Sequence, residues 1–417
     1  MRILFIAHYF QPEPNFFVGL PFAKALQEEG HQVQVLTGFP NYPDGKIYDD
    51  YKVKFIQKET MDGVPVIRVP LYPSHNRSSA KRILSYMSLS LSQSFIGPFA
   101  VKDADVAFVS QGPAAIGLPA IIHKMFRKIP FVYNIQDLWP DTLASTGMFN
   151  SKLGYKLVDM WCKHVYKKAA KIVVIAPGME KKLIERGVPA DKIEVIYNWC
   201  DDSLICRQEP NQQLAKELGM DGKFNIVFAG NMGKAQALEA VIEAAQILQN
   251  DCKDIQFVLV GGGVEVEALK QKAKDLALTN VIFHGRKPIS QIGLILRLAD
   301  VLLVHLRDDP LFRITIPSKT QAYLATGRPI MIGVNGDAAD LVENAGAGLR
   351  CEPENPRNIA ETVMKFYNME KGQLLQMGTN GMDFYDQNLS FNTATKHYLE
   401  IFEAAKQKDN LRLFSWK

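Results

Sequence analysis

Residues 305–336 read HLRDDPLFRITIPSKTQAYLATGRPIMIGVNG and contain a loop, a helix and a buried strand in succession. The charged loop 307–317 ends in proline, the helix 318–326 is stopped by Gly327, and an apolar strand follows at 329–334. A helix between two apolar runs is typical of a parallel sheet covered by helices. The segment predicts Ser318 as the helix N-cap and Lys319 in the first turn.

Lys319 is the residue of this segment that suggests a ligand. The start of a helix has free N–H groups and a partial positive charge, so it binds anions, above all phosphate. The helix dipole disfavours a lysine in the first turn, and a purely structural role would therefore gain little. We interpret Lys319 as a ligand of an anionic group, with packing as the alternative.

The bulk composition excludes several classes of protein. With 417 residues, 47% of them hydrophobic, the chain is long enough for two α/β domains with separate cores. A net charge of +4 is too small for a nucleic-acid-binding protein. The five cysteines form no CxxC pair, which indicates a reducing compartment without a zinc site. No signal peptide is recognisable and no apolar run reaches the roughly 18 residues that span a bilayer, so a cytoplasmic location is predicted.

Short apolar runs alternate with amphipathic segments along the whole chain, which predicts two doubly wound α/β sheets. The first domain is expected at 1–198, completed by a C-terminal helix at about 390–408, and the second at 199–389. Because such sheets bind ligands at the carboxyl ends of their strands, the two domains are expected to face each other across a cleft. The predicted strands are 2–7, 32–37, 64–69, 106–110, 131–135, 172–175, 193–196, 225–229, 256–260, 281–283, 301–305, 330–333 and 348–351.

Three strand ends of the second domain carry glycines or cations, in AGNMGK at 229–234, GGG at 261–263 and HGRKP at 284–288. Each alone is also explained by a tight turn or a solvated cation, and GGG lacks the glycine at 266 that a dinucleotide fingerprint requires. Together with Lys319 they converge on one edge of one sheet, which favours a diphosphate ligand such as a nucleotide-sugar. The residues concerned are Gly230, Asn231, Lys234, Gly262, Gly263, Arg286 and Lys287.

The segment NIQDLWPD at 134–141 ends a strand of the first domain. Asp137 and Asp141 offer carboxylates to sugar hydroxyls, and Trp139 offers an aromatic face to a sugar ring. The alternative is that one aspartate caps a helix. Because Asp137 lies at the carboxyl end of a strand, we favour a functional role.

The run HNRSSAKR at 75–82 precedes an amphipathic stretch at 83–100. A basic loop followed by an apolar stripe is typical of a helix that binds an anionic membrane surface. A solvated loop before a core helix is the alternative. The stripe consists of Ile83, Leu84, Met87, Leu91 and Phe95.

Taken together, the chain resembles the retaining GT-B glycosyltransferases of family four over nearly its whole length. The segments that carry this resemblance are GVPADKIEVI at 187–196, YNW at 197–199, and PSK through TGRP at 317–329. DLWPD at 137–141, GNMGK at 230–234 and SKTQAY at 318–323 are similar to a narrower group. This group is the WbuB-like enzymes of O-antigen and capsule synthesis, which are associated with L-fucosamine transfer.

The resemblance implies transfer of a sugar from a UDP-sugar to a lipid-linked glycan, with retention of configuration and without a metal or other cofactor. It implies that Lys234, Lys319 and Arg286 neutralise the leaving diphosphate, and that Asp137 positions the donor sugar or the acceptor. The catalytic set implied is Asp137, Lys234 and Lys319. The donor-binding set implied is Gly230, Asn231, Gly262, Gly263, Arg286, Lys287, Ser318 and Gln321. The acceptor-side set implied is Gly19, Trp139 and Asp141.

The chain departs from the family pattern at several positions. Family members have two glutamates separated by seven residues, where this chain has Ile314 and Ala322. The second glutamate holds the nucleotide ribose, so Gln321 is expected to take over this contact. The family histidine before Asp137 is Gln136 here. These departures keep two alternatives open, a nucleotide-sugar 2-epimerase and an inactive sugar-nucleotide-binding subunit.

Overall fold

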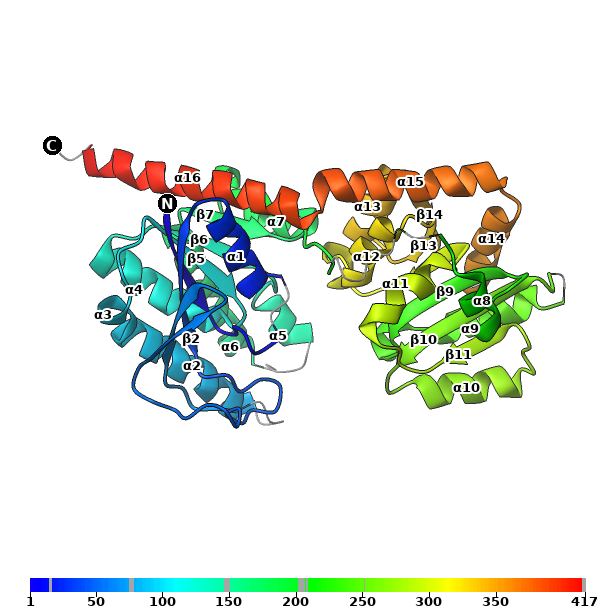
Figure 1. Cartoon of the computed structure of the whole chain (residues 1–417), viewed down its shortest axis with the longest axis horizontal. Coiled ribbons are helices and arrows are strands. Elements are labelled where there is room, and N and C mark those ends of the chain that lie inside the picture. Colours follow the sequence, from blue (N-terminus) through cyan, green and yellow to red (C-terminus); the bar gives the residue numbers. More distant parts are fainter. Residues whose placement is uncertain are drawn as a thin grey trace. The chain divides into compact units, whose positions relative to one another are not determined.

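The computed structural model describes residues 1–14, 17–74, 79–145, 151–201, 207, 209–250 and 252–414. It divides the chain into two compact units, Met1–Ile196 with Ala394–Lys417, and Tyr197–Thr393. Each unit contains a mostly or wholly parallel sheet with helices packed around it (Figure 1). The predicted fold class, two doubly wound α/β sheets, is confirmed.

The first unit has an eight-stranded sheet in the order β3-β4-β2-β1-β5-β6-β7-β8. Its central strands are buried along nearly their whole length, as parallel strands covered on both faces must be. All neighbouring strands are parallel except β3 and β4. The strands are β1 Arg2–Ala7, β2 Gln32–Gly38, β3 Gln57–Met61, β4 Val64–Val69, β5 Val106–Gln111, β6 Phe131–Ile135, β7 Lys171–Val174 and β8 Ile193–Val195.

Strand β3 was not predicted from the sequence. It lies at the edge of the sheet, and its segment QKETM has no apolar run because none of its residues is fully buried. The signal that could have revealed it is the dipeptide Asp62-Gly63, whose positive φ angles of 47° and 86° form the turn of a hairpin.

The helices of the first unit cover both faces of its sheet. The last helix returns to this unit, where Tyr398 packs against Phe22 and Phe108 and accepts a hydrogen bond from the amide of Asn134. Figure 1 shows this helix in red. The helices are α1 Leu20–Glu28, α2 Ser79–Phe95, α3 Gly97–Ala100, α4 Gly117–Arg127, α5 Asp141–Ser145, α6 Lys152–Lys168, α7 Pro177–Glu185 and α16 Phe391–Phe414, with short 3-10 turns η1 Ala114–Ile116 and η2 Ala190–Lys192.

The apolar stripe of α2 faces solvent instead of the core. The side chains of Ile83, Leu84, Met87, Leu91 and Phe95 are between 41% and 71% exposed. The core-helix interpretation of this stripe is therefore wrong. Of the basic run before it, residues 75–78 lie outside the described part of the chain, whereas Lys81 is exposed and Arg82 is half-buried.

The second unit has six parallel strands in the order β11-β10-β9-β12-β13-β14. They are β9 Phe224–Asn231, β10 Ile255–Gly262, β11 Val281–His284, β12 Val301–His305, β13 Ile330–Gly333 and β14 Gly348–Arg350. The helices and 3-10 turns are α8 Gln212–Glu217, η4 Lys234–Gln236, α9 Glu239–Leu248, α10 Val266–Asp275, α11 Ile289–Arg297, η5 Phe312–Ile314, α12 Ser318–Thr326, α13 Asp337–Asn344, α14 Pro356–Tyr367 and α15 Lys371–Asn388. In neither unit do the described residues form a helix long and apolar enough to cross a membrane.

Candidate functional site

The ends of β9 and β10 lie side by side at the carboxyl edge of the second sheet. Gly230 is paired with Gly261 and Asn231 with Gly262, and the Met232 N–H donates to the Gly262 carbonyl at 2.8 Å. Gly261 has a φ of +138°, and a Cβ at this position would lie 2.0 Å from the carbonyl oxygen of Gly230. Residue 261 must therefore be glycine for the two backbones to approach this closely.

Helix α12 places Lys319 against this edge. Its Nζ lies 3.6 Å from the ring centroid of Phe228 in β9. A Cβ at Gly230 would lie 3.4 Å from the same Nζ. Although the residue as a whole is half-buried, Nζ is buried and has no hydrogen-bond partner within the described residues. Burial lowers the pKa of Lys319 to about 7.

A buried ammonium without a hydrogen-bond partner is costly, and the contact with Phe228 offsets only part of the desolvation. A negatively charged ligand beside Nζ would provide the missing partner. Gly230 is exposed and has no side chain, so only backbone lies beside Nζ on that side. The arrangement fits a phosphate group better than it fits a packing role.

The start of α12 differs from the prediction. The N-cap is Pro317, with φ −58° and ψ 133°, and Ser318 is the first residue of the helix. The prediction that Ser318 caps the helix was wrong. Proline suits the cap because its fixed φ matches the chain path and it has no N–H to satisfy. Ser318 is exposed at the first turn, where its hydroxyl can still meet a ligand.

Gln321 and Ala322 face the interior of the second unit, with exposed fractions of 2% and 8%. In the amide orientation that satisfies both contacts, Gln321 donates to the carbonyls of Pro317 and Ser318 at 2.8 and 3.0 Å. Its amide nitrogen thus stabilises the first turn of α12. This engagement leaves the nitrogen unavailable for the ribose contact expected from the sequence.

Sequence reasoning missed Tyr323, which fixes α12 to β9. Its hydroxyl accepts a hydrogen bond from the Ala229 N–H at 2.9 Å and donates to the Ala229 carbonyl at 3.2 Å. The pairing of β12 with β9 ends at Val227, before Ala229. Tyr323 therefore provides hydrogen-bond partners for the Ala229 N–H and carbonyl, which β12 does not reach. Burial raises the pKa of the Tyr323 hydroxyl. Its contact holds the residue immediately before Gly230.

Replacing Tyr323 with phenylalanine is expected to destabilise the protein by about 1–3 kcal/mol, because both polar groups of Ala229 lose this partner. The measurement is the midpoint of urea unfolding followed by circular dichroism. Tyr367→Phe is the matched control, since Tyr367 is a half-buried tyrosine of α14 in the same unit. Equal midpoints for Tyr323→Phe and the wild type would contradict this role.

The other residues that the sequence predicted for the donor side differ in how closely they approach this edge. Arg286 follows β11, and its side chain lies over Gly262, where a Cβ would be 2.8 Å from Nε. Gly263 has a φ of +154° and packs against the Met232 carbonyl. Lys287 is half-buried, whereas Asn231 and Lys234 are exposed. The structure therefore brings Gly230, Gly262, Arg286 and Lys319 together and leaves Lys234 on the surface of η4.

His305, at the end of β12, is a second residue that the sequence did not reveal. Its Nδ1 donates to the Gln236 carbonyl at 2.7 Å, and its Nε2 accepts from the Glu354 N–H at 3.2 Å. This pattern requires the neutral imidazole. Burial also favours the neutral form, because it lowers the pKa of His305. His305 thus positions the loop after β9 without adding charge to the site.

In the first unit, Asp137 follows β6 at the carboxyl edge of the sheet and is exposed. The side chain of Gln111, at the end of β5, donates to the Asp137 carbonyl at 3.1 Å. Although Asp137 is exposed, desolvation by the surrounding protein raises the pKa of its carboxyl. The carboxyl of Asp137 is therefore accessible at this edge of the sheet.

Asp141 and Gly19 have structural contacts. Asp141 forms an ion pair with Arg186, whose side chain is 10% exposed and also donates to the Trp139 carbonyl at 3.1 Å. Asp141 therefore anchors the segment 137–141, a structural role that the sequence did not predict for this residue. Gly19 is the buried N-cap of α1 and accepts a hydrogen bond from the Ala23 N–H at 3.1 Å.

An aromatic cluster lies at the end of β1 and was also missed. His8 is buried and meets Tyr9 and Tyr86 edge to face, at centroid distances of 4.4 and 5.2 Å. Tyr9 in turn lies 5.0 Å from Tyr42. The rule that ligands bind at the carboxyl ends of strands could have singled out His8, the residue that follows β1 directly.

The acidic pair Asp308-Asp309 in the loop before α12 is not part of a metal cluster. Arg313 donates to both carboxylate oxygens of Asp308 at 3.0 and 2.7 Å. Across the described residues, no three His, Cys, Asp or Glu side chains gather closely enough to hold a metal ion.

Comparison with known families matches both units. Residues 20–199 match the glycosyl transferase 4-like domain, and residues 223–369 match the glycosyl transferases group 1 domain. A Pseudomonas aeruginosa protein named probable glycosyltransferase WbjE is 24% identical to this chain. The aligned region covers 72% of this chain and 76% of WbjE. WcaI of Escherichia coli K12, a glycosyl transferase assigned by its name to colanic acid biosynthesis, is 25% identical, covering 79% and 83%.

Among solved structures, HepE of Anabaena in complex with UDP superposes with a TM-score of 0.68. The two chains are 16% identical, and the match covers 97% of this chain and 100% of HepE. At this identity the similarity concerns the fold. The two domain matches and the fold lead to one conclusion: the chain is a glycosyltransferase of the GT-B type, in which a glycosyl transferase 4-like domain precedes a glycosyl transferases group 1 domain.

Proposed function

We propose that this glycosyltransferase moves a sugar from a UDP-sugar to a lipid-linked glycan in O-antigen or capsule synthesis. The observation that carries the proposal is the buried ammonium of Lys319 beside the glycine edge of β9 and β10. A nucleotide diphosphate would be the negatively charged partner that this buried ammonium does not have among the described residues. HepE, which shares the fold, was crystallised in complex with UDP, and this supports UDP as the carrier.

The transfer proceeds with retention of configuration and without a metal ion. Lys319 and Arg286 neutralise the diphosphate as it leaves, a role that divalent metals fulfil in other transferases. Exposed Lys234 can join them from η4. The acceptor hydroxyl attacks from the face that the diphosphate leaves, and the diphosphate accepts its proton. Asp137 positions the donor sugar or the acceptor.

The sugar we favour is N-acetyl-L-fucosamine, on the similarity of the segments 137–141, 230–234 and 318–323 to WbuB-like enzymes. The name of WcaI, a colanic acid biosynthesis glycosyl transferase, supports a role in a bacterial surface polysaccharide. We place the enzyme in the cytoplasm, reversibly bound to the inner face of the cell membrane. The exposed apolar stripe of α2 supports this location.

The direct test incubates the purified enzyme with a panel of UDP-sugars and a lipid acceptor extracted from membranes. Release of UDP that depends on the acceptor, with a labelled sugar recovered in the lipid fraction, supports the proposal. Conversion of the donor to its 2-epimer without an acceptor would identify an epimerase. Binding of UDP-sugars without any product would identify an inactive binding subunit.

The affinity for UDP is expected to fall as the pH rises above about 7. The pKa of Lys319 is about 7 without ligand, and a neighbouring diphosphate raises it. Between about pH 6 and 7 the ammonium is largely formed and the terminal phosphate of UDP is still largely ionised, so affinity is at its maximum. Above about pH 7, binding must take up a proton, and affinity falls by up to about tenfold per pH unit.

Calorimetry in two buffers of different ionisation enthalpy measures this proton uptake. At about pH 8.5 the terminal phosphate of UDP is itself deprotonated, so the uptake reports the protein. Lys319→Met is expected to bind UDP weakly and without proton uptake. Binding of UDP to the wild type with no proton uptake at this pH would contradict the assignment of Lys319.

Transfer activity is expected to survive an excess of EDTA, because lysine and arginine side chains neutralise the diphosphate. The measurement is the initial rate with and without chelator, and the control adds magnesium back. Complete loss of activity on chelation, restored by magnesium or manganese, would show that a metal ion carries the charge instead.

A further inference from the structure

The first unit contains a cavity of ≈ 370 Å³ that none of the steps above uses. It lies among α2, η1, α4 and α6, next to the segment 137–141. Nearly all of its lining is apolar, and the main contributors are Met87, Leu118, Trp139, Leu143, Val158 and Trp161. The indole N–H of Trp161 donates to the Ala114 carbonyl at 2.9 Å, so it presents no free donor to the cavity.

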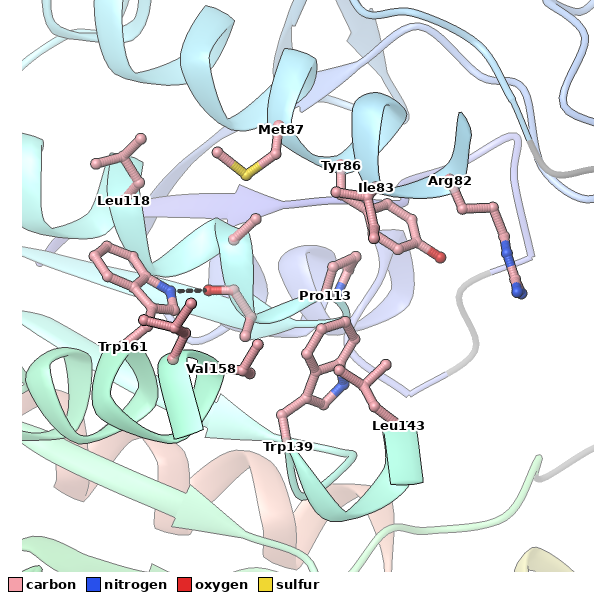
Figure 2. A pocket seen from close by; sticks show the side chains of 13 residues that line it. Arg82, Ile83, Tyr86, Met87, Pro113, Leu118, Trp139, Leu143, Val158 and Trp161 are labelled. Carbon is pink, nitrogen blue, oxygen red and sulfur yellow. Dashed lines mark hydrogen bonds between the residues drawn. The ribbon is translucent and has the colours of Figure 1, made fainter. Parts of the chain in front are cut away.

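The two ends of this cavity differ in chemistry (Figure 2). Arg82 and the phenol oxygen of Tyr86 lie at one end, whereas Leu118 and Trp161 lie at the other. Nε of Arg82 is buried and has no hydrogen-bond partner within the described residues. The cavity thus combines a cationic end with an apolar body, which matches a ligand with an anionic head and a hydrocarbon tail.

A sugar does not fit this lining, because its hydroxyl groups would lose their hydrogen bonds to water and find few partners. Hydrocarbon loses nothing on entering such a site. The apolar character also continues beyond the cavity, since Ile83 and Met87 of α2 and Leu157 of α6 line it and are still 41–53% exposed. A chain longer than the cavity therefore meets further apolar surface at its rim.

We propose that this cavity binds the part of the acceptor lipid next to its phosphate, with the hydrocarbon chain inside and the phosphate at Arg82. This inference deepens the proposed function and rests on it for the identity of the acceptor. It gives Trp139 of the DLWPD segment a different role from the sugar stacking expected from the sequence. Its indole forms a wall of the lipid site.

The test uses alkyl phosphates below their critical micelle concentrations and follows tryptophan fluorescence, because Trp139 and Trp161 both line the cavity. Affinity is expected to rise by about fourfold per CH₂ from butyl to octyl phosphate, and then to level off when the cavity is filled. Equal affinities for butyl and octyl phosphate would overturn the proposal.

Two substitutions test the two ends of the cavity separately. Val158→Phe fills the apolar body and is expected to weaken octyl phosphate binding at least about tenfold. Met160→Phe is its control, because Met160 is an exposed residue of α6 outside the cavity. Arg82→Gln is expected to weaken octyl phosphate about tenfold or more and to leave the uncharged octyl glucoside unaffected. Lys81→Gln, at an exposed neighbouring position, is the control for charge.

Unchanged octyl phosphate binding by Val158→Phe would also overturn the proposal. Ala115→Leu, which adds bulk to the lining from η1, replaces Val158→Phe if that variant does not fold. The outcomes separate this inference from the proposed function. Lipid phosphate binding by a protein that transfers no sugar supports the cavity and rejects the function. Transfer to a lipid acceptor with the same KM in wild type and Val158→Phe rejects the cavity and retains the function.

Discussion

Replacing Lys319 with methionine is expected to lower turnover by about 100-fold or more while leaving the protein at least as stable as the wild type. The loss follows because an electrostatic contact to the leaving diphosphate disappears, which costs on the order of 3 kcal/mol in the transition state. The stability does not fall because Nζ is buried without a hydrogen-bond partner within the described residues. Methionine fills similar space and has no charge to desolvate.

The size of the stability gain depends on pH. In the folded protein the pKa of Lys319 is about 7, below its ordinary value of 10.5. The wild type therefore carries the full cost of burying the ammonium below pH 7, and this cost fades as the pH rises towards 10.5. The stability advantage of Lys319→Met should accordingly be largest at or below neutral pH.

Initial rates and urea midpoints at two pH values measure both effects. Lys234→Met is the control for the urea midpoints alone, because Lys234 is an exposed lysine of the same unit and its replacement should give no gain in stability. Lys319→Met with more than half of the wild-type rate would refute the role of Lys319 in catalysis. A lower midpoint at neutral pH would refute the argument from burial.

Replacing Leu84, Leu91 and Phe95 with serine is expected to reduce partitioning onto anionic vesicles by about 100-fold or more. These side chains are 42–71% exposed on α2 and do not line the apolar cavity of the first unit. Each contributes on the order of 1 kcal/mol or more when it enters the membrane interface. The wild type should bind more weakly at high salt, because the basic residues of this region act through screened electrostatics.

Co-sedimentation with vesicles that contain phosphatidylglycerol measures the partitioning at low and high salt. Leu375→Ser is the control, because Leu375 is a 67% exposed leucine in the second unit. Rates with an acceptor that has no long lipid chain should not change in the triple variant. If the wild type does not bind these vesicles at low salt, the stripe has another partner and the membrane assignment is wrong.

Local sequence patterns predicted most of the fold. Apolar runs of four to eight residues predicted strands such as β1, β6, β12 and β13 with bounds close to those observed, because a strand buried on both faces needs apolar side chains at nearly every position. The edge strand β3 was missed for the same reason, since one exposed face leaves no apolar run. Parallel topology then brought the ends of β9 and β10 to one edge, as expected from the sequence.

Only the tertiary structure decided the chemistry of individual side chains. The sequence suggested Lys319 as a phosphate ligand, but the low pKa of its ammonium depends on burial against Phe228, which is distant in sequence. The sequence offered both Asp137 and Asp141 as carboxylates for a sugar, and only the structure shows that Asp141 forms an ion pair with Arg186. The apolar cavity of the first unit likewise exists only where α2, η1, α4 and α6 meet. The periodicity of apolar residues in the sequence indicates which face of a helix or strand is apolar. Desolvation, ion pairs and cavities depend instead on residues that are distant in sequence and come into contact only in the folded protein.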